Sequence, residues 1–173
     1  MAGVREAGRQ LVRGAVAGVL GTVAMDGLWY ARHRREGGRE PFVAWEVTSQ
    51  ITDWEAAPAP ARMGRKLIGV VTGRDVPVER AAAVNNVMHW GYGTSWAAGY
   101  ALLTAAAGRR RAWWHGPAFG TAVWASDYVT LPLAGVYEPI WRYDVPTLWK
   151  DLSAHLVFGT VADGVLRAVG SRT

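Results

Sequence analysis

The feature that most constrains the fold is a run of 28 residues without a charged side chain, from Ala81 to Gly108. A helix of this length extends about 42 Å, which exceeds the ~30 Å hydrocarbon core of a bilayer. Three further runs contain one acidic residue each, namely 14–31 with Asp26, 112–137 with Asp127 and 152–166 with Asp163. The four runs predict transmembrane helices near 11–32, 81–107, 112–136 and 151–169.

The overall composition leaves a soluble alternative open. Charged residues make up 19% of the chain, against about 25% in a typical soluble domain, but the mean hydropathy is only +0.02. An Asp at the centre of a span costs about 2.5–3.5 kcal/mol, whereas each good apolar residue returns only ~0.3–0.6 kcal/mol. Asp26 must therefore face a protein interior if its helix is to span a membrane. The alternative is a soluble helical bundle with tryptophan-rich packing.

Aromatic side chains gather at the ends of the predicted spans. Trp29 and Tyr30 close the first span, and Trp113 and Trp114 open the third. Tryptophan and tyrosine favour the interface between lipid and water, so these positions support the membrane interpretation. We therefore expect an all-α polytopic membrane protein, a four-transmembrane-helix bundle in which residues 1–173 form a single integral membrane domain.

The connection over 33–80 is long enough to form structure of its own. Apolar residues recur at helical spacing in two places, first at Ala44, Val47, Ile51 and Trp54 and then at Met63, Leu67 and Val71. This spacing predicts one or two short amphipathic helices on the membrane surface, separated by the Ala-Pro-Ala-Pro segment at 57–60.

The basic residues predict an orientation. One side of the predicted bundle holds both termini and the turn between the second and third spans, with Arg5, Arg9, Arg13, Arg109, Arg110, Arg111, Arg167 and Arg172. Short basic loops weigh most in the positive-inside rule, so both termini are expected in the cytoplasm. The opposite orientation is favoured by the basic residues that follow the first span, Arg32, Arg34, Arg35 and Arg39.

Small residues recur every four positions within the predicted spans. They are Gly14 and Gly18 in the first span, Gly91, Ser95 and Gly99 in the second, Gly116 and Gly120 in the third, and Gly159 in the fourth. Small residues let helix backbones approach closely in lipid. These positions therefore predict helix–helix contacts.

Each predicted span also carries ionisable residues. In the chosen orientation the outer half of the bilayer holds one from each helix, namely Asp26, His89, Asp127 and His155, and Asp163 lies nearer the cytoplasmic side. Polar and aromatic neighbours on the second span are Asn85, Tyr92 and Tyr100. Ionisable groups inside a membrane are functional candidates, so we expect the first four residues to converge on a polar site. The alternative is that each is a packing residue, hydrogen-bonded across the bundle.

Several function classes lack support in the sequence. The absence of cysteine excludes disulfides, thiolate zinc sites and thiol nucleophiles. No P-loop, zinc-protease or hydrolase motif occurs, and the Gly-Tyr-Gly at 91–93 lacks the preceding Thr-Val of a potassium filter. The basic residues lie at span ends, where topology explains them, so no nucleic-acid partner is expected. We predict no enzymatic activity, no cofactor and no metal.

A set of residues in the second half carries a resemblance to a known family. The set comprises His89-Trp90, Gly99-Tyr100, Trp114-x-Gly116 with Gly120, Pro132-Leu133-x-Gly135, Pro139, His155-Leu156-Val157, Asp163 and Arg167. In order and spacing it resembles the YagU-type family of small bacterial inner-membrane proteins, although Asp127 stands where a member of that family carries histidine. The resemblance implies a multi-pass protein of the bacterial inner (plasma) membrane without an assigned reaction, in a family linked to acid tolerance.

Three kinds of function fit these observations. The first is proton or small-solute handling linked to envelope or acid stress, because histidine titrates near pH 6.5. The second is a structural or assembly subunit, as a homo-oligomer or in a membrane complex, whose polar residues only lock the helices together. The third is a haem held by His89 and His155, or a divalent ion such as zinc on the Asp/His cluster. Shared protons are favoured over a metal because all four helices would have to pack correctly at once.

Overall fold

The computed structural model describes residues 2–47, 51–107 and 112–170. Within these ranges the chain is all-helical, with no β-strand, which confirms the predicted all-α class. The four predicted spans correspond to four long helices, α1 (Ala2–Arg35), α4 (Ala81–Ala106), α5 (His115–Leu133) and α6 (Val145–Gly170). The short elements are α2 (Phe42–Val47), α3 (Ala59–Thr72) and two 3-10 turns, η1 (Val78–Arg80) and η2 (Ile140–Arg142).

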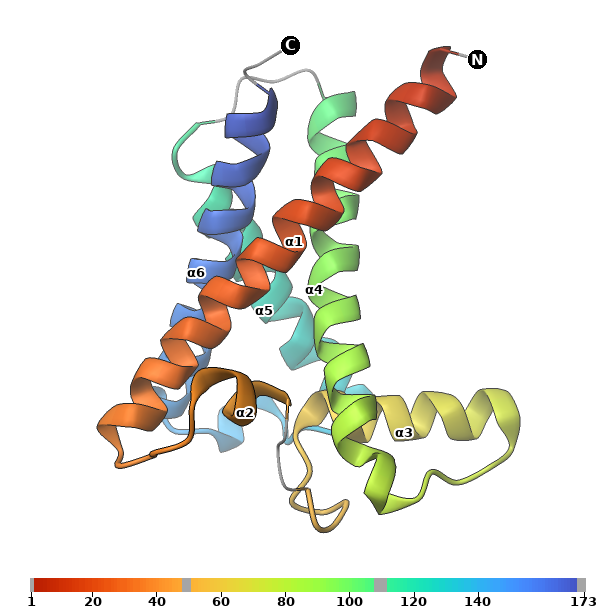
Figure 1. The fold of residues 1–173 in the computed structure, drawn as a ribbon, viewed down its shortest axis with the longest axis vertical. Coiled ribbons are helices and arrows are strands. Elements are labelled where there is room, and N and C mark those ends of the chain that lie inside the picture. Colours follow the sequence, from red (N-terminus) through yellow and green to blue (C-terminus); the bar gives the residue numbers. More distant parts are fainter. Residues whose placement is uncertain (1, 48–50, 108–111, 171–173) are drawn as a thin grey trace.

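The long helices cross at an angle instead of running as parallel rods (Figure 1). Helix α1 runs diagonally across α4 and α6 and packs against both, while α5 packs against α6. Helices α4 and α5 stand apart and are bridged by side chains such as Tyr100 and Phe119, whose rings stack with centroids 4.2 Å apart. The start of α1 and the end of α6 lie at one end of the molecule, and α2 and α3 lie at the other.

Glycines allow α1 to touch the backbone of α4. A Cβ atom added to Gly14 would lie 2.5 Å from the Cα atom of Ala98, and one added to Gly18 would lie 2.7 Å from the Cα atom of Thr94. Ordinary van der Waals contact begins at 3.4 Å, so neither position has room for a side chain. The two glycines therefore set the closest approach of the two helices.

The α5–α6 contact is equally close. A Cβ atom on Gly120 would lie 2.1 Å from the carbonyl oxygen of His155, and one on Gly159 would lie 2.4 Å from the carbonyl oxygen of Gly116. Gly116 and Gly120, the two glycines of α5 predicted to pack, thus both contact the backbone of α6. This contact fixes the height of His155 relative to α5.

The predicted packing face of α4 is wrong by two positions. Gly91 and Gly99 have no atom within 4 Å of an added Cβ, and Ser95 is exposed. The contact with α1 is made instead by the buried residues Gly93, Ala97 and Ala101. Alanine is small enough to serve the same purpose as glycine, so a pattern based on glycine and serine alone selected the opposite side of the helix.

Two of the long helices, over Gly3–Arg35 and Val145–Val169, are long and apolar enough to cross a membrane. In each of them, 33% of the most apolar window is buried inside the structure. Helices α4 and α5 do not reach the same hydropathy. They lack acidic and basic residues apart from Asp127, but Gly, Tyr, Trp, His and Asn replace aliphatic residues in them.

The connection between α1 and α4 forms two short helices, as predicted, but the first is shorter than expected. Helix α2 ends at Val47, so Ile51 and Trp54 lie outside it, and residues 48–50 are outside the described part of the chain. Helix α3 lies across the end of the bundle, where Lys66 donates a hydrogen bond to the carbonyl oxygen of Ala134 (2.6 Å). The predicted basic turn at 109–111 and Arg172 also lie outside the described residues.

Candidate functional site

Asp26 and His89 form the first polar pair of the bundle. Asp26 lies on α1 two turns beyond the glycine contact and is only 3% exposed, and His89 faces it from α4. The Nε2 atom of His89 lies 2.9 Å from Oδ1 and 3.2 Å from Oδ2 of Asp26. The pair satisfies the requirement that Asp26 face a protein interior.

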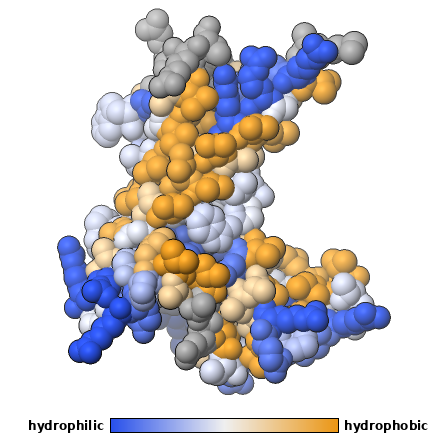
Figure 2. All heavy atoms as spheres, viewed as in Figure 1, coloured by the Kyte–Doolittle hydropathy of each residue, from blue (hydrophilic) through white to orange (hydrophobic). Residues whose placement is uncertain are grey.

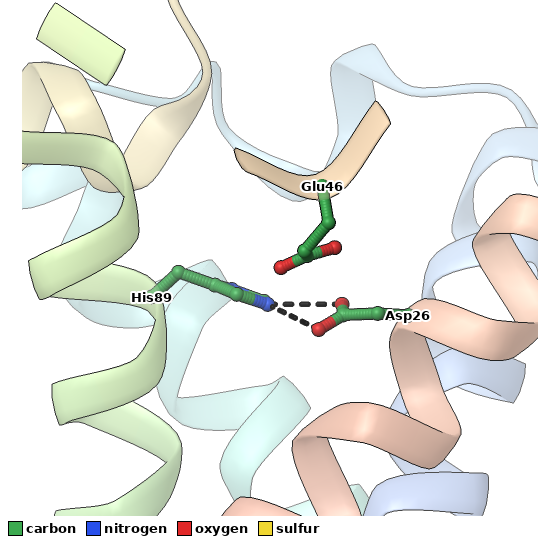
Figure 3. A group of neighbouring side chains, drawn as sticks. All are labelled: Asp26, Glu46 and His89. Carbon is green, nitrogen blue, oxygen red and sulfur yellow. Dashed lines mark hydrogen bonds and ion pairs between the residues drawn. The ribbon is translucent and has the colours of Figure 1, made fainter. Parts of the chain in front are cut away.

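Glu46 approaches the same pair from α2 (Figure 3). One ligand atom from each of Asp26, Glu46 and His89 lies within 4.8 Å of the other two. The indole Nε1 of Trp90 donates a hydrogen bond to Oε1 of Glu46 (3.1 Å). Burial raises the pKa of the Glu46 carboxyl above its usual value, and the negative charge of Asp26 raises it further. Among the residues that the structure describes, these three form a group whose geometry could hold a metal ion.

Aromatic packing holds α2 over the pair. The ring of Tyr30 on α1 lies 5.2 Å from that of Phe42 and 5.5 Å from that of Trp45, between ring centroids. The Tyr30 hydroxyl also donates a hydrogen bond to the carbonyl oxygen of Glu40 (2.8 Å), just before α2 begins. The position of Glu46 is therefore fixed by contacts of its helix with α1.

Asp127 and His155 form the second polar pair. Nε2 of His155 lies 3.2 Å from Oδ2 of Asp127, and both side chains are partly buried, at 14% and 13% exposed. The Tyr92 hydroxyl donates a hydrogen bond to Oδ1 of Asp127 (2.5 Å). On its other side, Nδ1 of His155 lies 3.0 Å from the carbonyl oxygen of Asp151 and 3.4 Å from Oδ1 of the same residue.

Both ring nitrogens of His155 have oxygen neighbours, an arrangement that suits an additional proton on the imidazole or on its carboxylate partner. Nδ1 faces only oxygen atoms of Asp151, so it carries a hydrogen. Nε2 faces a carboxylate oxygen of Asp127, and this contact is a hydrogen bond only when a second proton lies between the two atoms. The pair therefore has the geometry to hold a proton between an imidazole and a carboxylate.

A cavity of about 330 Å³ is bordered by His89 of the first pair and by both members of the second pair. His89 and Tyr92 line it from α4, and Asp127 and His155 line it from α5 and α6. Its remaining wall includes all three methionines that follow the first residue, Met25, Met63 and Met88. The start of α3 also lines the cavity. The four residues expected to converge thus lie together as two pairs at this end.

Asp163 lies outside this cavity. It is 2% exposed and accepts hydrogen bonds from the Tyr100 hydroxyl (2.8 Å) and from Nε of Arg167 (2.7 Å). Arg167 also donates to the carbonyl oxygen of Ala112. Asp163 and Tyr100 therefore lie near the other end of the bundle, where they tie α4, α6 and the start of α5 together.

Sequence reasoning missed two members of the site, Glu46 and Asp151. Asp151 lies four residues before His155 on the same helix, and this spacing is a detectable signal. Glu46 has no comparable signal, because its position depends on α2 folding back over the first and second spans. Among the expected supporting residues, Asn85 lies one turn from His89, and its Oδ1 atom is buried without a hydrogen-bond partner among the described residues.

Comparisons with known proteins give no match: no family model fits the chain, and no curated protein or solved structure is significantly similar to it.

Proposed function

We propose that the chain is a multi-pass protein of the bacterial inner membrane in which α1, α4, α5 and α6 all cross the bilayer and both termini are cytoplasmic. Exposed aliphatic side chains support this proposal on every long helix, for example Val12, Val87, Leu133 and Val169. Figure 2 shows apolar surface along the middle of the molecule and hydrophilic side chains at its two ends. A surface of this kind is expected to face lipid.

Exposed tryptophans support the same arrangement. Trp113 and Trp114 are exposed at the start of α5, and Trp141 and Trp149 are exposed near the start of α6. These two helix starts lie at opposite ends of the bundle. Tryptophans at both ends are typical of the two interfaces of a membrane.

We infer that the cavity handles protons, and that the Asp127–His155 pair is its proton-holding group. The observation that carries this inference is the contact of 3.2 Å between Nε2 of His155 and Oδ2 of Asp127 in the wall of a cavity. A histidine beside a carboxylate gains or loses a proton near the pH at which an acid-stressed envelope operates. The groups that face His155 are Asp151, Asp127, Tyr92 and, across the cavity, His89. The proposed relationship to the YagU-type family, linked to acid tolerance, agrees with this function.

Proton flux into vesicles tests the proposal. The purified protein is reconstituted in liposomes that contain a pH-sensitive dye, and a pH gradient is imposed. We expect faster acidification than in protein-free vesicles, and His155→Gln should abolish the difference. His115→Gln is the matched control, because His115 lies at the start of α5 outside the cavity. Equal flux in wild type and His155→Gln would contradict the proposal.

Single cysteines test the topology without background labelling, because the chain contains no cysteine. Gly3→Cys places a thiol near the N-terminus, and Glu138→Cys places one in the exposed connection between α5 and α6. In intact cells a membrane-impermeant maleimide should label the variant at 138 and leave the variant at 3 unlabelled. The reverse pattern would invert the orientation, and recovery of the protein in the soluble fraction would exclude a membrane protein.

An assembly subunit is the second candidate, and the gap between α4 and α5 favours it. This open groove has a volume of about 730 Å³ and includes Gly99, whose face has no neighbour within 4 Å. Small residues on an open face suit contact with a helix of another copy. If this reading holds, Gly99→Leu should dissociate an oligomer in detergent, and substitutions at His155 should lower the protein level without a specific change in proton flux.

A further inference from the structure

Three side chains that are far apart in the sequence point toward one another beneath α2 (Figure 3). Asp26 comes from α1, Glu46 from α2 and His89 from α4. Their nearest ligand atoms all lie within 4.8 Å of one another. A single ion placed between them would therefore be reached by one atom from each residue with small side-chain adjustments.

The charges of the three side chains are unbalanced in the absence of a cation. With both carboxylates ionised and the imidazole neutral, the three side chains would carry two negative charges, and Asp26 is nearly fully buried. Buried charge is costly unless it is paired or coordinates a metal. A divalent cation neutralises both carboxylates at once, whereas a proton on His89 neutralises only one.

We propose that Asp26, Glu46 and His89 bind a divalent first-row transition-metal ion of the zinc class. Imidazole nitrogen together with carboxylate oxygen is a ligand set that zinc accepts, with bond lengths near 2.0–2.2 Å. Magnesium and calcium prefer six or more oxygen ligands, so the histidine disfavours them.

Two buried oxygen atoms without partners in the described part of the chain lie on the helices that carry Asp26 and His89, each one turn from the ligand of its helix. Oγ1 of Thr22 and Oδ1 of Asn85 are buried without hydrogen-bond partners among the described residues. Thr22 is 0% exposed and lies one turn before Asp26, and Asn85 lies one turn before His89.

The surroundings also hold the ligands in place. Trp90 Nε1 donates a hydrogen bond to Glu46, so Glu46 is oriented by a neighbour that is not itself a ligand. Asn86 Nδ2 donates a hydrogen bond to the carbonyl oxygen of Val47 (3.3 Å), which ties the end of α2 to α4. Such outer contacts usually change metal affinity by about 10–100-fold when they are removed. Three ligands plus an adjoining cavity leave an open coordination position.

Metal titration of the full-length protein tests the proposal. The protein is purified in detergent with a tag that lacks histidine, stripped with EDTA and titrated with Zn²⁺, while Co²⁺ serves as the spectroscopic probe. We expect one tightly bound Zn²⁺ per chain, a tetrahedral or five-coordinate Co²⁺ spectrum and no competition from Mg²⁺. Glu46→Gln should weaken Zn²⁺ binding by about 100-fold or more, and Trp90→Phe by about 10–100-fold.

The matched control is Glu40→Gln. Glu40 lies just before α2, is exposed and bonds His33 outside the site, so its loss should leave Zn²⁺ affinity unchanged. The helical circular dichroism of each variant shows whether it is folded. If Glu46→Gln does not fold, Trp90→Phe still tests the site. Absence of Zn²⁺ binding by the wild type, or equal affinity in the wild type and the folded Glu46→Gln variant, would overturn the proposal. The proton function depends on Asp127 and His155, so either proposal can fail alone.

Discussion

Substitution of Gly120 by alanine is expected to separate α5 from α6. The added Cβ would lie 2.1 Å from the carbonyl oxygen of His155 and 2.8 Å from its carbonyl carbon. Both obstacles are backbone atoms, which cannot rotate away as the end of a flexible side chain can. The helices must therefore move apart by more than about 1 Å to restore ordinary contact, and such a gap forfeits a quarter to a half of the dispersion attraction between facing atoms.

The cost follows from this displacement. Overpacking of a close contact typically costs about 1–3 kcal/mol of unfolding free energy, and obstruction by backbone places Gly120→Ala at the upper end, about 3 kcal/mol. The contact between Nε2 of His155 and Oδ2 of Asp127 is 3.2 Å and would exceed hydrogen-bond distance after the same movement. The variant should therefore lose stability and proton flux together.

Denaturant unfolding in detergent micelles, followed by circular dichroism, measures the effect. Gly164→Ala is the matched control, since Gly164 lies on α6 with no atom within 4 Å of an added Cβ. In a helix this replacement should stabilise by about 0.5–1 kcal/mol. Equal unfolding free energies for the two variants would refute the assignment of Gly120 to a backbone contact.

Three further predictions concern the ends of the bundle. Asp163→Asn should lower the unfolding free energy by about 2–3 kcal/mol, because it leaves the half-buried Arg167 without its charge partner, and a loss below 0.5 kcal/mol would exclude this role. Gly73→Ala should cost about 1 kcal/mol in the same assay, since Gly73 ends α3 with φ at +67° in open space and only strain can act there. Arg65 lowers the pKa of Asp75 from 3.8 to about 2, so the contribution of this pair to stability is complete above pH 4 and is lost as the pH falls toward 2. The difference in stability between wild type and Asp75→Asn should therefore shrink over that range, and a constant difference would show that the two side chains do not interact in solution.

The charge pattern predicted the positions of the four long helices well, but it did not predict which of them are apolar enough to cross a membrane. A run without charge over α4 correctly indicated one long helix, because neither a turn nor a polar surface helix usually tolerates such a run. Absence of charge does not amount to high hydropathy, however, and the Gly, Tyr and Trp residues of α4 lower it. For this reason α1 and α6, with their valines and leucines, satisfy the criterion for a span where α4 does not.

The candidate site was predictable to the extent that it depends on the long helices. Asp26, His89, Asp127 and His155 each interrupt an apolar helix, and burial forces such residues to find partners. The partner of each one depends on helix rotation, and the two-position error on α4 shows that small-residue spacing does not determine rotation. Glu46 could not be found from spacing, because its contact with Asp26 arises only when α2 packs on Tyr30.

Because α1 contacts α4 closely at Gly18, a small rotation of α1 about this crossing point displaces residues farther along the helix. Asp26 lies eight residues beyond this pivot, about 12 Å along the helix axis, so a rotation of about 5° at the crossing moves Asp26 by about 1 Å relative to His89. The 34-residue α1 is about 51 Å long, far more than the ~30 Å of a hydrocarbon core, so in the proposed membrane arrangement it would tilt to match a bilayer. The proposed membrane arrangement would therefore couple the geometry of the Asp26–His89 pair to bilayer thickness, with thinner membranes increasing the tilt of α1 and shifting the carboxylate relative to the imidazole.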